Sequence, residues 1–218
     1  MLVQDWMSSK VITVDHDASI MKASKLMKQN GIQHLPVLKG DRLIGMVSDR
    51  DLKEAQPSKA TTLDIHELYY LLDEIKVKSV TSRQLFTTTP KETLEKAAAT
   101  MLKHNISALP VVDPEGAVAG IITKGDVFRA FVAISGIHRA ELQLGFELED
   151  RPGSIGEVAS VIRAHGGRIV SILTEYERAP EGFRFVYIRA REVGNEQALF
   201  KELEGKYKVL YHSHDRLD

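Results

Sequence analysis

The chain has 218 residues, of which 43% are hydrophobic and 27% are charged, and its formal net charge is −1. This composition is typical of a soluble globular protein with one large domain or two to three small ones, and the low net charge excludes a general attraction to nucleic acid or anionic membranes. The absence of cysteine excludes disulfides, thiolate metal sites and cysteine nucleophiles. The N-terminus lacks a secretory signal pattern, and the longest apolar stretch, 127–137, is too short to span a bilayer, so we expect a cytoplasmic protein.

The first half of the chain contains an internal repeat. Residues 11–38 align with residues 85–112, with eight identities over 28 positions. With one residue inserted in the second copy, the alignment continues to the phrases GMVSDRDL at 45–52 and GIITKGDV at 120–127. Two copies are too few for a solenoid, so we expect two modules packed on each other as a pair.

Each copy predicts the element order β-α-β-β-α. Apolar residues recur at helical spacing after the first strand, and the run from Thr89 to Glu92 predicts a capping box at the start of that helix in the second copy. Gly31 or Asn105 can take the left-handed conformation that ends the helix. The predicted strands are 11–14, 34–38 and 43–47 in the first copy and 85–88, 108–112 and 118–122 in the second.

The repeated phrase places a hydroxyl residue where a strand passes into a helix. Ser48 and Thr123 stand at the predicted N-cap, and Asp51 and Asp126 follow three residues later. One interpretation is structural: the hydroxyl caps a backbone N–H and the acid favours the positive end of the helix, together worth about 1 kcal/mol. The other is functional: the N–H groups and the hydroxyl bind a phosphate, and the carboxylate accepts both hydroxyls of a ribose. The sequence alone leaves both interpretations open.

These features, taken over residues 1–135, resemble a pair of cystathionine-β-synthase (CBS) domains. The resemblance rests on the opening Val3-x-Asp5-x-Met7, the threonine of the first strand, the Leu-Pro-Val strand and the repeated phrase. It implies a homodimer formed through these modules and a regulatory site for AMP, ADP, ATP or S-adenosylmethionine. The nucleotide-binding residues that it implies are Thr13, His34, Pro36, Ser48 and Asp51 in one site, and Thr87, Pro110, Thr123 and Asp126 in the other. We add Arg50, which can reach a phosphate as a fork donor in the first site, and Lys124, a point charge in the second.

Residues 55–76 are predicted to form a linker between the copies, with an amphipathic helix over 63–72. The run His-Glu-Leu-Tyr-Tyr-Leu-Leu within it resembles the linker of the acetoin utilization proteins called AcuB. That resemblance implies a role near acetoin or related carbon metabolism.

The C-terminal third predicts a different module. Alternating apolar residues from position 141 open the order β-α-β-β-α-β, the ferredoxin-like arrangement, with Ser154 and Asn195 as predicted helix caps. The phrase Asp-Arg-Pro-Gly-Ser-Ile at 150–155 resembles the signature of ACT domains, small regulatory modules that often bind amino acids between subunits. The ligand candidates that this resemblance implies are Asp150, Pro152 and Gly153. The alternatives, that Gly153 serves only the turn and the domain only dimerisation, stay open.

The sequence therefore predicts a mixed α/β (α+β) fold with CBS domain 1 over 1–54, a linker over 55–76, CBS domain 2 over 77–135 and a ferredoxin-like ACT domain over 140–214. It predicts a ligand sensor that is not an enzyme and holds no cofactor, because no Walker A, Rossmann or kinase pattern appears. His212 and His214 make a poor metal pair near a chain end, so no metal site is predicted. The alternatives are a small hydrolase or transferase acting on the bound nucleotide, and a dimerisation scaffold without ligand; the regulated protein partner is unknown.

Overall fold

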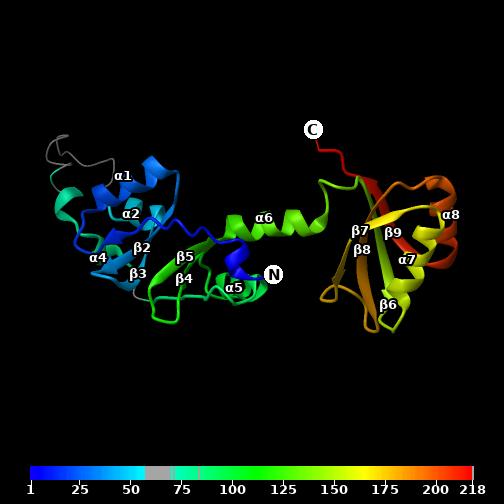
Figure 1. Ribbon diagram of the computed structural model, residues 1–218, viewed down its shortest axis with the longest axis horizontal. Helices are drawn as coiled ribbons and strands as arrows, with labels where there is room; N and C mark the ends of the chain where they lie inside the picture. The colour runs from blue at the N-terminus through cyan, green and yellow to red at the C-terminus, as the bar shows by residue number, and fades with distance from the viewer. Residues whose placement is uncertain (57–69, 71, 83, 218) are drawn as a thin grey trace. The chain divides into compact units, whose positions relative to one another are not determined.

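The computed structural model describes residues 1–56, 70, 72–82 and 84–217. This part of the chain forms two compact units, Met1–Val127 and Phe128–Asp218 (Figure 1). Most of the predicted linker helix over 63–72 lies outside the described residues. Within the described ranges, every helix is too short or too polar to cross a membrane.

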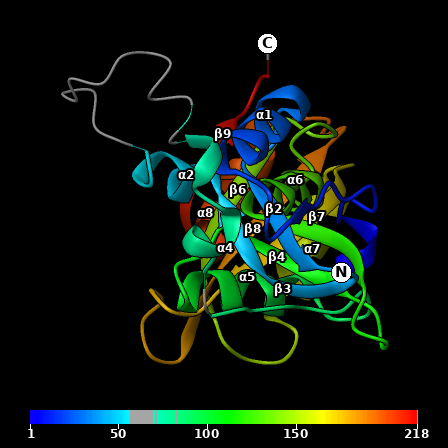
Figure 2. The ribbon, with the colours of Figure 1, turned by 90° about the vertical axis from the view of Figure 1, so that its left-hand side faces the viewer.

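The first copy of the repeat forms a three-stranded sheet with helices packed against it (Figures 1 and 2). Its strand β2 pairs in parallel with β1 and antiparallel with β3. The buried face of α1, formed by Ile20, Ala23 and Met27, joins a core that also contains residues of β2, β3 and α2. The elements are η1 (Val3–Asp5), β1 (Val14–Asp15), α1 (Ile20–Asn30), β2 (His34–Lys39), β3 (Arg42–Ser48) and α2 (Asp49–Glu54).

The second copy repeats this plan, which confirms the predicted order of helices and antiparallel strands. Leu94, Ala97 and Met101 form the buried face of its first helix. Gly31 and Asn105 end the first helices of the two copies with positive φ angles of 62° and 51°, as predicted. The elements are α4 (Val77–Val80), α5 (Leu94–Lys103), β4 (Ala108–Val112), β5 (Val118–Thr123) and α6 (Lys124–Ser135).

The first strand of each copy is shorter than the four residues predicted. β1 spans only Val14–Asp15, and its counterpart in the second copy is a single bridging residue, Thr88. The N–H of Thr88 donates to the carbonyl of Pro110 at 3.0 Å. Pro110 has no N–H with which to continue this ladder, and Pro36 imposes the same limit on β1. In each copy the proline therefore stops the pairing from extending toward the N-terminal end of the first strand.

The capping box predicted at Thr89 is wrong. The cap of α5 is Thr93, whose hydroxyl accepts a hydrogen bond from the third N–H of the helix at 3.3 Å. The carbonyls of Pro90 and Glu92 instead accept hydrogen bonds of 3.0 and 2.9 Å from the backbone of the N-terminal segment. Those bonds keep 90–92 out of the helix, and a partner so distant in sequence is invisible to a local pattern.

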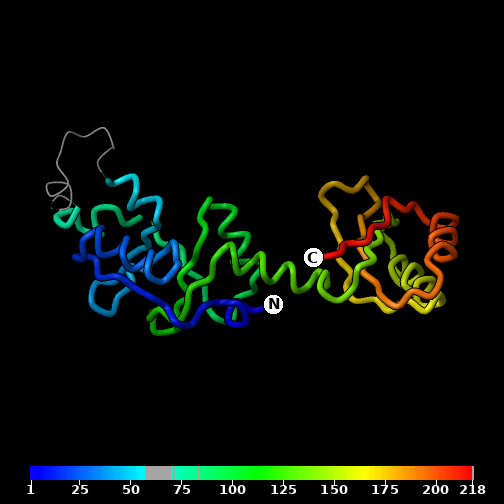
Figure 3. The backbone as a smooth tube through the Cα atoms, turned by 90° about the horizontal axis from the view of Figure 1, so that it is seen from above, coloured from blue at the N-terminus to red at the C-terminus, as the bar shows by residue number. Residues whose placement is uncertain are grey.

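The segment that leads into each copy of the repeat lies on the other copy. The N-terminal segment runs along the second copy (Figure 3), where Ser8 and Ile121 exchange backbone hydrogen bonds of 2.9 and 3.0 Å. The segment before the second copy lies in turn on the first copy, where the N–H of Ser82 donates to the carbonyl of Met46 at 3.1 Å. Each module is thus completed by the stretch of chain that precedes the other one.

These crossings explain the glycine that opens each repeated phrase. A Cβ atom on Gly45 would lie 2.2 Å from Cγ2 of Thr81 and 3.0 Å from the carbonyl oxygen of Ser82. A Cβ atom on Gly120 would lie 2.4 Å from Sδ of Met7. At Gly45, where a backbone carbonyl lies in the way, only a residue without a side chain lets the crossing segment approach so closely, whereas at Gly120 the nearest atoms belong to the flexible Met7 side chain.

The C-terminal unit is a four-stranded sheet in the order β7-β8-β6-β9, with α7 and α8 packed on one face (Figure 1). This is the predicted β-α-β-β-α-β order. The core between sheet and helices includes Phe146, Ile162 and Leu199, all fully buried. The elements are β6 (Leu142–Glu149), α7 (Ser154–Ala164), β7 (Arg168–Glu175), β8 (Phe183–Arg191), α8 (Glu196–Lys206) and β9 (Lys208–His214).

One of the two helix caps predicted in this unit is confirmed. The side chain of Asn195 accepts from the N–H of Ala198 at 3.0 Å and caps α8. The predicted cap at Ser154 is wrong, because Gly153, with φ 88°, holds the N-cap position of α7. The hydroxyl of Ser154 donates to the carbonyl of Arg151 at 3.1 Å, so it is turned away from the first turn of the helix.

A buried arginine on the sheet forms hydrogen bonds with residues near both ends of the C-terminal unit. Arg189 is 3% exposed, and its guanidinium donates to the carbonyl of Ala140 at 3.1 Å and to Asp215 at 2.7 Å. The hydrogen bond from Arg189 lowers the pKa of Asp215 below its usual value. Nothing in the sequence pattern marks this arginine as buried, since its neighbours alternate as in any strand.

Candidate functional site

Both copies of the repeated phrase form a complete capping box. The Asp51 carboxylate accepts from the N–H of Ser48 at 2.7 Å and from its hydroxyl at 2.6 Å, and that hydroxyl accepts from the N–H of Asp51 at 3.3 Å. Thr123 and Asp126 repeat these contacts at 2.7, 2.7 and 3.3 Å. The structural interpretation of the phrase therefore holds in both copies, and a ligand role needs groups beyond those that the cap uses.

Both caps use only Oδ2 of the aspartate, so the two aspartates differ in their exposure rather than in the oxygen that the cap leaves available. At Asp51 the cap uses Oδ2 alone, and Oδ1 has no hydrogen bond within the described residues. Asp51 is also partly exposed, whereas Asp126 is only 3% exposed. Because both oxygens of a carboxylate accept hydrogen bonds, Asp51 can hold the cap and a ligand at once.

A cavity of about 450 Å³ lies beside the first phrase and is walled by both copies of the repeat. That volume suits a small organic ligand. Its lining residues are His34, Met46, Ser48, Arg50, Asp51 and Glu54 from the first copy and Ser82, Gln84, Phe86, Asn105, Ile106, Ser107 and Ala108 from the second. The sequence analysis found His34, Ser48, Arg50 and Asp51 but missed the opposite wall, because a repeat does not reveal how its copies pack.

His34 spans the two copies at this cavity. Its Nε2 atom lies 2.9 Å from the hydroxyl of Ser107. On the second-copy wall, the ring of Phe86 is stacked on His104 with 3.8 Å between ring centroids. The cavity therefore combines a free carboxylate oxygen, hydroxyls and an aromatic ring, which are groups that suit a nucleoside.

Burial lowers the pKa of His34, and the charge of Asp51 opposes part of this shift. The unfolded chain therefore binds a proton at His34 more readily than the folded chain does. This contribution is fully favourable to folding above the usual histidine pKa of about 6.5 and weakens as the pH falls below it. We expect the free energy of unfolding to fall more between pH 7.5 and 5.5 in the wild type than in His34→Gln.

Urea unfolding at both pH values measures this difference. Glutamine keeps a hydrogen-bonding group for Ser107 but does not titrate. The comparison therefore distinguishes the effect of protonation at position 34 from the effect of the hydrogen bond to Ser107. Equal losses of stability in the two proteins would show that His34 is not responsible.

The remaining residues of the predicted nucleotide sites lie outside the described lining of this cavity: Thr13, Pro36, Thr87, Pro110, Thr123, Lys124 and Asp126. Pro36 and Pro110 are buried within β2 and β4. Thr123, Lys124 and Asp126 lie together where β5 meets α6, as the repeat predicts.

Arg50, predicted to reach a phosphate, is paired with its own helix. Its Nε atom donates to the Glu54 carboxylate at 3.0 Å, and both side chains are largely exposed, at 85% and 66%. An exposed pair of this kind is weak, typically below about 1 kcal/mol. Arg50 is therefore within reach of the cavity, but an anion must compete with Glu54 for it.

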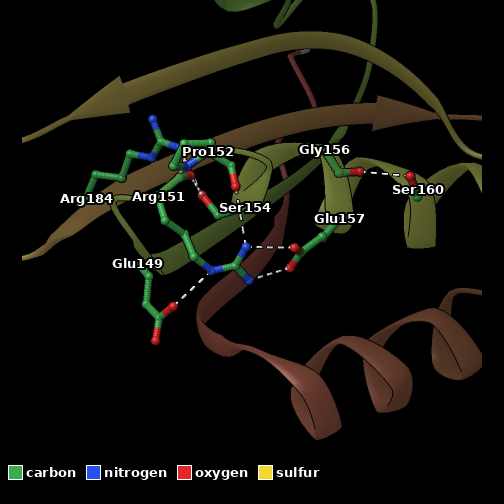
Figure 4. A network of polar contacts seen from close by, with 8 residues as sticks. All are labelled: Glu149, Arg151, Pro152, Ser154, Gly156, Glu157, Ser160 and Arg184. Carbon is green, nitrogen blue, oxygen red and sulfur yellow. Dashed lines mark hydrogen bonds and ion pairs between the residues drawn. The ribbon is translucent and has the colours of Figure 1, made fainter.

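The turn of the C-terminal unit that carries Asp150, Pro152 and Gly153 is dominated by Arg151 (Figure 4). Arg151 makes a two-pronged pair with Glu157 at 2.8 and 2.7 Å and also donates to Glu149 at 3.0 Å. The hydrogen bonds from Arg151 to Glu157 lower the pKa of the Glu157 carboxyl below its usual value.

Two of the three ligand candidates of this turn, Asp150 and Pro152, contact arginine side chains. Asp150 lies 3.5 Å from Arg184, and the carbonyl of Pro152 accepts from Arg151 at 3.5 Å. A cavity of about 470 Å³ adjoins the turn, with Glu149, Arg151, Ser154 and Glu157 in its wall, but its described lining does not include the three candidates.

In the described part of the chain, two groups of side chains have the chemistry to ligate a metal, and members of both contact neighbouring side chains. His212 is stacked on Phe200 with 4.1 Å between centroids, and His214 bonds to Glu196 at 3.1 Å. Asp15, His16 and Asp17 hold their ligand atoms within 4.8 Å of one another, but the ammonium of Lys78 bonds to Asp17 at 2.6 Å. These partners are those of ordinary surface ion pairs and ring contacts.

Comparison with known families decides the identity of the first unit. The model of the CBS domain matches residues 3–58 and 77–133, which together make up more than half of the chain. The chain belongs to the CBS domain family. The two matched segments correspond to the two copies of the repeat, so the tandem CBS pair inferred from the sequence is confirmed.

The relatives fall into two groups by coverage. An uncharacterized protein of Methanocaldococcus jannaschii is 33% identical over 155 residues, covering 61% of this chain and 92% of that protein. A homoserine O-acetyltransferase of Methanosalsum zhilinae is 37% identical over 126 residues, covering 57% of this chain. The alignment covers only 23% of that acetyltransferase, so the enzyme name describes a much longer protein.

Two of the similar solved structures hold ligands, and a third carries the AcuB name. The CBS pair of protein MJ0100, solved with 5′-methylthioadenosine and S-adenosyl-L-methionine, is 29% identical, with a TM-score of 0.51 over 61% of this chain and 97% of that one. CBSX2, solved with AMP, is 30% identical, with a TM-score of 0.50 over 62% and 98%. The acetoin utilization protein AcuB of Vibrio cholerae is 29% identical, with a TM-score of 0.51 over 65% and 98%.

Proposed function

We propose that this chain is a regulatory protein that binds an adenosyl compound in the cavity lined by His34, Ser48 and Asp51. The observation that carries the proposal is that Asp51 lines a cavity of about 450 Å³ while its Oδ1 has no hydrogen bond within the described residues, and that the other module supplies an aromatic wall. The binding of adenosyl ligands by similar CBS pairs supports it. Asp51 accepts the ribose hydroxyls, and the wall that includes Phe86 receives the base.

The regulatory effect follows from the position of the cavity between the two copies. A ligand held there touches both walls and favours the arrangement of modules that fits it. It shifts the balance between two arrangements only by its difference in affinity for them. No step of this mechanism breaks a bond in the ligand, so the ligand is recovered unchanged.

The test is calorimetric titration with adenosine, 5′-methylthioadenosine, S-adenosylmethionine, AMP and ATP, with GMP as a control base. Thermal unfolding is a second measurement of binding. At 100 times its dissociation constant a ligand adds about 2.7 kcal/mol of stability, which raises the melting temperature by roughly 5–10 °C for a chain of this size. If none of the adenosyl compounds binds, the proposal is refuted. Repeated turnover of AMP or ATP would favour a hydrolase or transferase instead.

For the C-terminal unit we propose an ACT-type regulatory domain over 140–214. Its strand order and its turn with Gly153 at φ 88° support this assignment. An amino-acid ligand would bind at the turn that carries Asp150, Pro152 and Gly153, and titration with the twenty amino acids tests it. The likeness to AcuB makes acetoin and related carbon metabolism the first setting in which to seek the regulated partner.

We propose that the protein is a homodimer formed through its CBS modules; the ACT-type domain is the other candidate contact surface. Leu102 on α5 is 76% exposed, and Phe128 and Phe131 on α6 are 69% and 55% exposed. Large apolar side chains with such exposure are typical of surfaces covered by a partner. Light scattering should give twice the chain mass of 24.3 kDa, and Leu102→Ser should shift it toward the monomer. A monomeric wild type would contradict this proposal.

A further inference from the structure

The described lining of the cavity proposed to bind adenosyl compounds has more carboxylates than guanidinium groups. Its described lining contains one guanidinium, that of Arg50, and two carboxylates, those of Asp51 and Glu54. Asp51 is committed to the capping box through Oδ2 and, in the proposed function on which this inference rests, to the ribose through Oδ1. Glu54 has neither of these tasks.

The Glu54 carboxylate instead pairs with Arg50, the cation that a ligand phosphate would bind. Arg50 Nε donates to its Oε1 at 3.0 Å across one turn of α2. A ligand phosphate that approaches Arg50 meets the Glu54 carboxylate at the same place and must compete with it. A ligand that carries no charge there is unaffected, and a cationic ligand is attracted by the same carboxylate.

We propose that Glu54, through its pairing with Arg50, makes this cavity select adenosyl compounds that are uncharged or cationic at the 5′ position over those with a 5′ phosphate. S-adenosylmethionine, which carries a sulfonium cation at that position, is then favoured over AMP. AMP is in turn favoured over ATP, whose added phosphates increase the repulsion.

The signature of this role is a change whose sign depends on the charge of the ligand. In Glu54→Gln we expect AMP to bind about two- to fivefold more tightly and S-adenosylmethionine about two- to fivefold more weakly, the range for partly exposed charge pairs. The affinity for neutral 5′-methylthioadenosine should be unchanged. Raising the salt concentration from 50 to 500 mM should shrink both changes, because exposed charges are screened.

Calorimetric titration of the three ligands into the full chain measures these affinities. Glu115→Gln removes the same charge from an exposed turn of the second copy and should change none of them. In an Arg50→Gln background, Glu54→Gln should give AMP a smaller benefit than in the wild type, since it then relieves only the repulsion of the phosphate and frees no cation. Equal changes for all three ligands, or no change, would overturn the role of Glu54 while leaving adenosyl binding intact. If none of the three binds the wild type, the proposed function fails and this inference fails with it.

Discussion

Replacing Asp51 by alanine should weaken the binding of adenosyl compounds by about 10- to 100-fold. The variant loses the hydrogen bonding of a charged carboxylate to the ribose, and because both hydroxyls share the single oxygen Oδ1 we take the value of one such bond, about 1.5–3 kcal/mol. It also loses the capping box, which costs about 1 kcal/mol of folding stability and leaves the helix intact in a folded module. Calorimetric titration measures the affinity, and thermal unfolding without ligand measures the capping cost.

Asp49→Ala is the matched control for this variant. Asp49 lies in the same first turn of α2 and carries the same charge, but its carboxylate pairs with Lys53 at 2.5 Å and is not in the described lining of the cavity. Its replacement should change the affinity by less than about threefold, the range of an exposed ion pair. Asp126→Ala tests the second phrase in the same way, and a larger loss there than in Asp51→Ala would move the site to the second copy.

The second large effect concerns the stability of the CBS pair. Gly45→Ala should lower its free energy of unfolding by about 1–3 kcal/mol, the usual range for overpacking a tight site. The new methyl group would lie 2.2 Å from the side chain of Thr81 and 3.0 Å from the carbonyl of Ser82. Because this segment completes the first module, the strand and the segment must separate to admit the methyl group. Urea unfolding measures the loss.

Two further glycines serve as controls for Gly45→Ala. Gly120→Ala meets Met7 Sδ at 2.4 Å, but a methionine side chain can rotate away, so we expect a cost below about 1 kcal/mol. Gly125→Ala, near the start of α6, meets only a hydroxyl at 3.5 Å and should be neutral or stabilising by up to about 1 kcal/mol. If Gly45→Ala were as stable as Gly125→Ala, the crossing of the exchanged segments would not be as close as described.

The sequence predicts much of this architecture because the repeat encodes it locally. Helical spacing predicted the helix α1, whose buried face holds Ile20, Ala23 and Met27, and the repeated phrase placed Ser48 and Asp51 at a helix start. Such features depend on residues within one or two turns of each other. They are read from a single copy and checked against the other.

The parts that the sequence did not predict depend on contacts between distant segments. The cap of α5 moved to Thr93 because the N-terminal segment binds the carbonyls of Pro90 and Glu92. The second wall of the cavity, with Phe86 and Ser107, exists only because the copies pack face to face. A repeat reports that two modules are alike, but not which of their surfaces meet.

A crystal structure with a bound adenosyl compound tests the central claim most directly. The account predicts that the ribose hydroxyls donate to Oδ1 of Asp51 and that the base lies against the wall that contains Phe86 and Ser107. The capping bonds between Ser48 and Asp51 Oδ2 should persist in that complex. A ligand seated elsewhere, with Asp51 touching only Ser48 and water, would contradict the account.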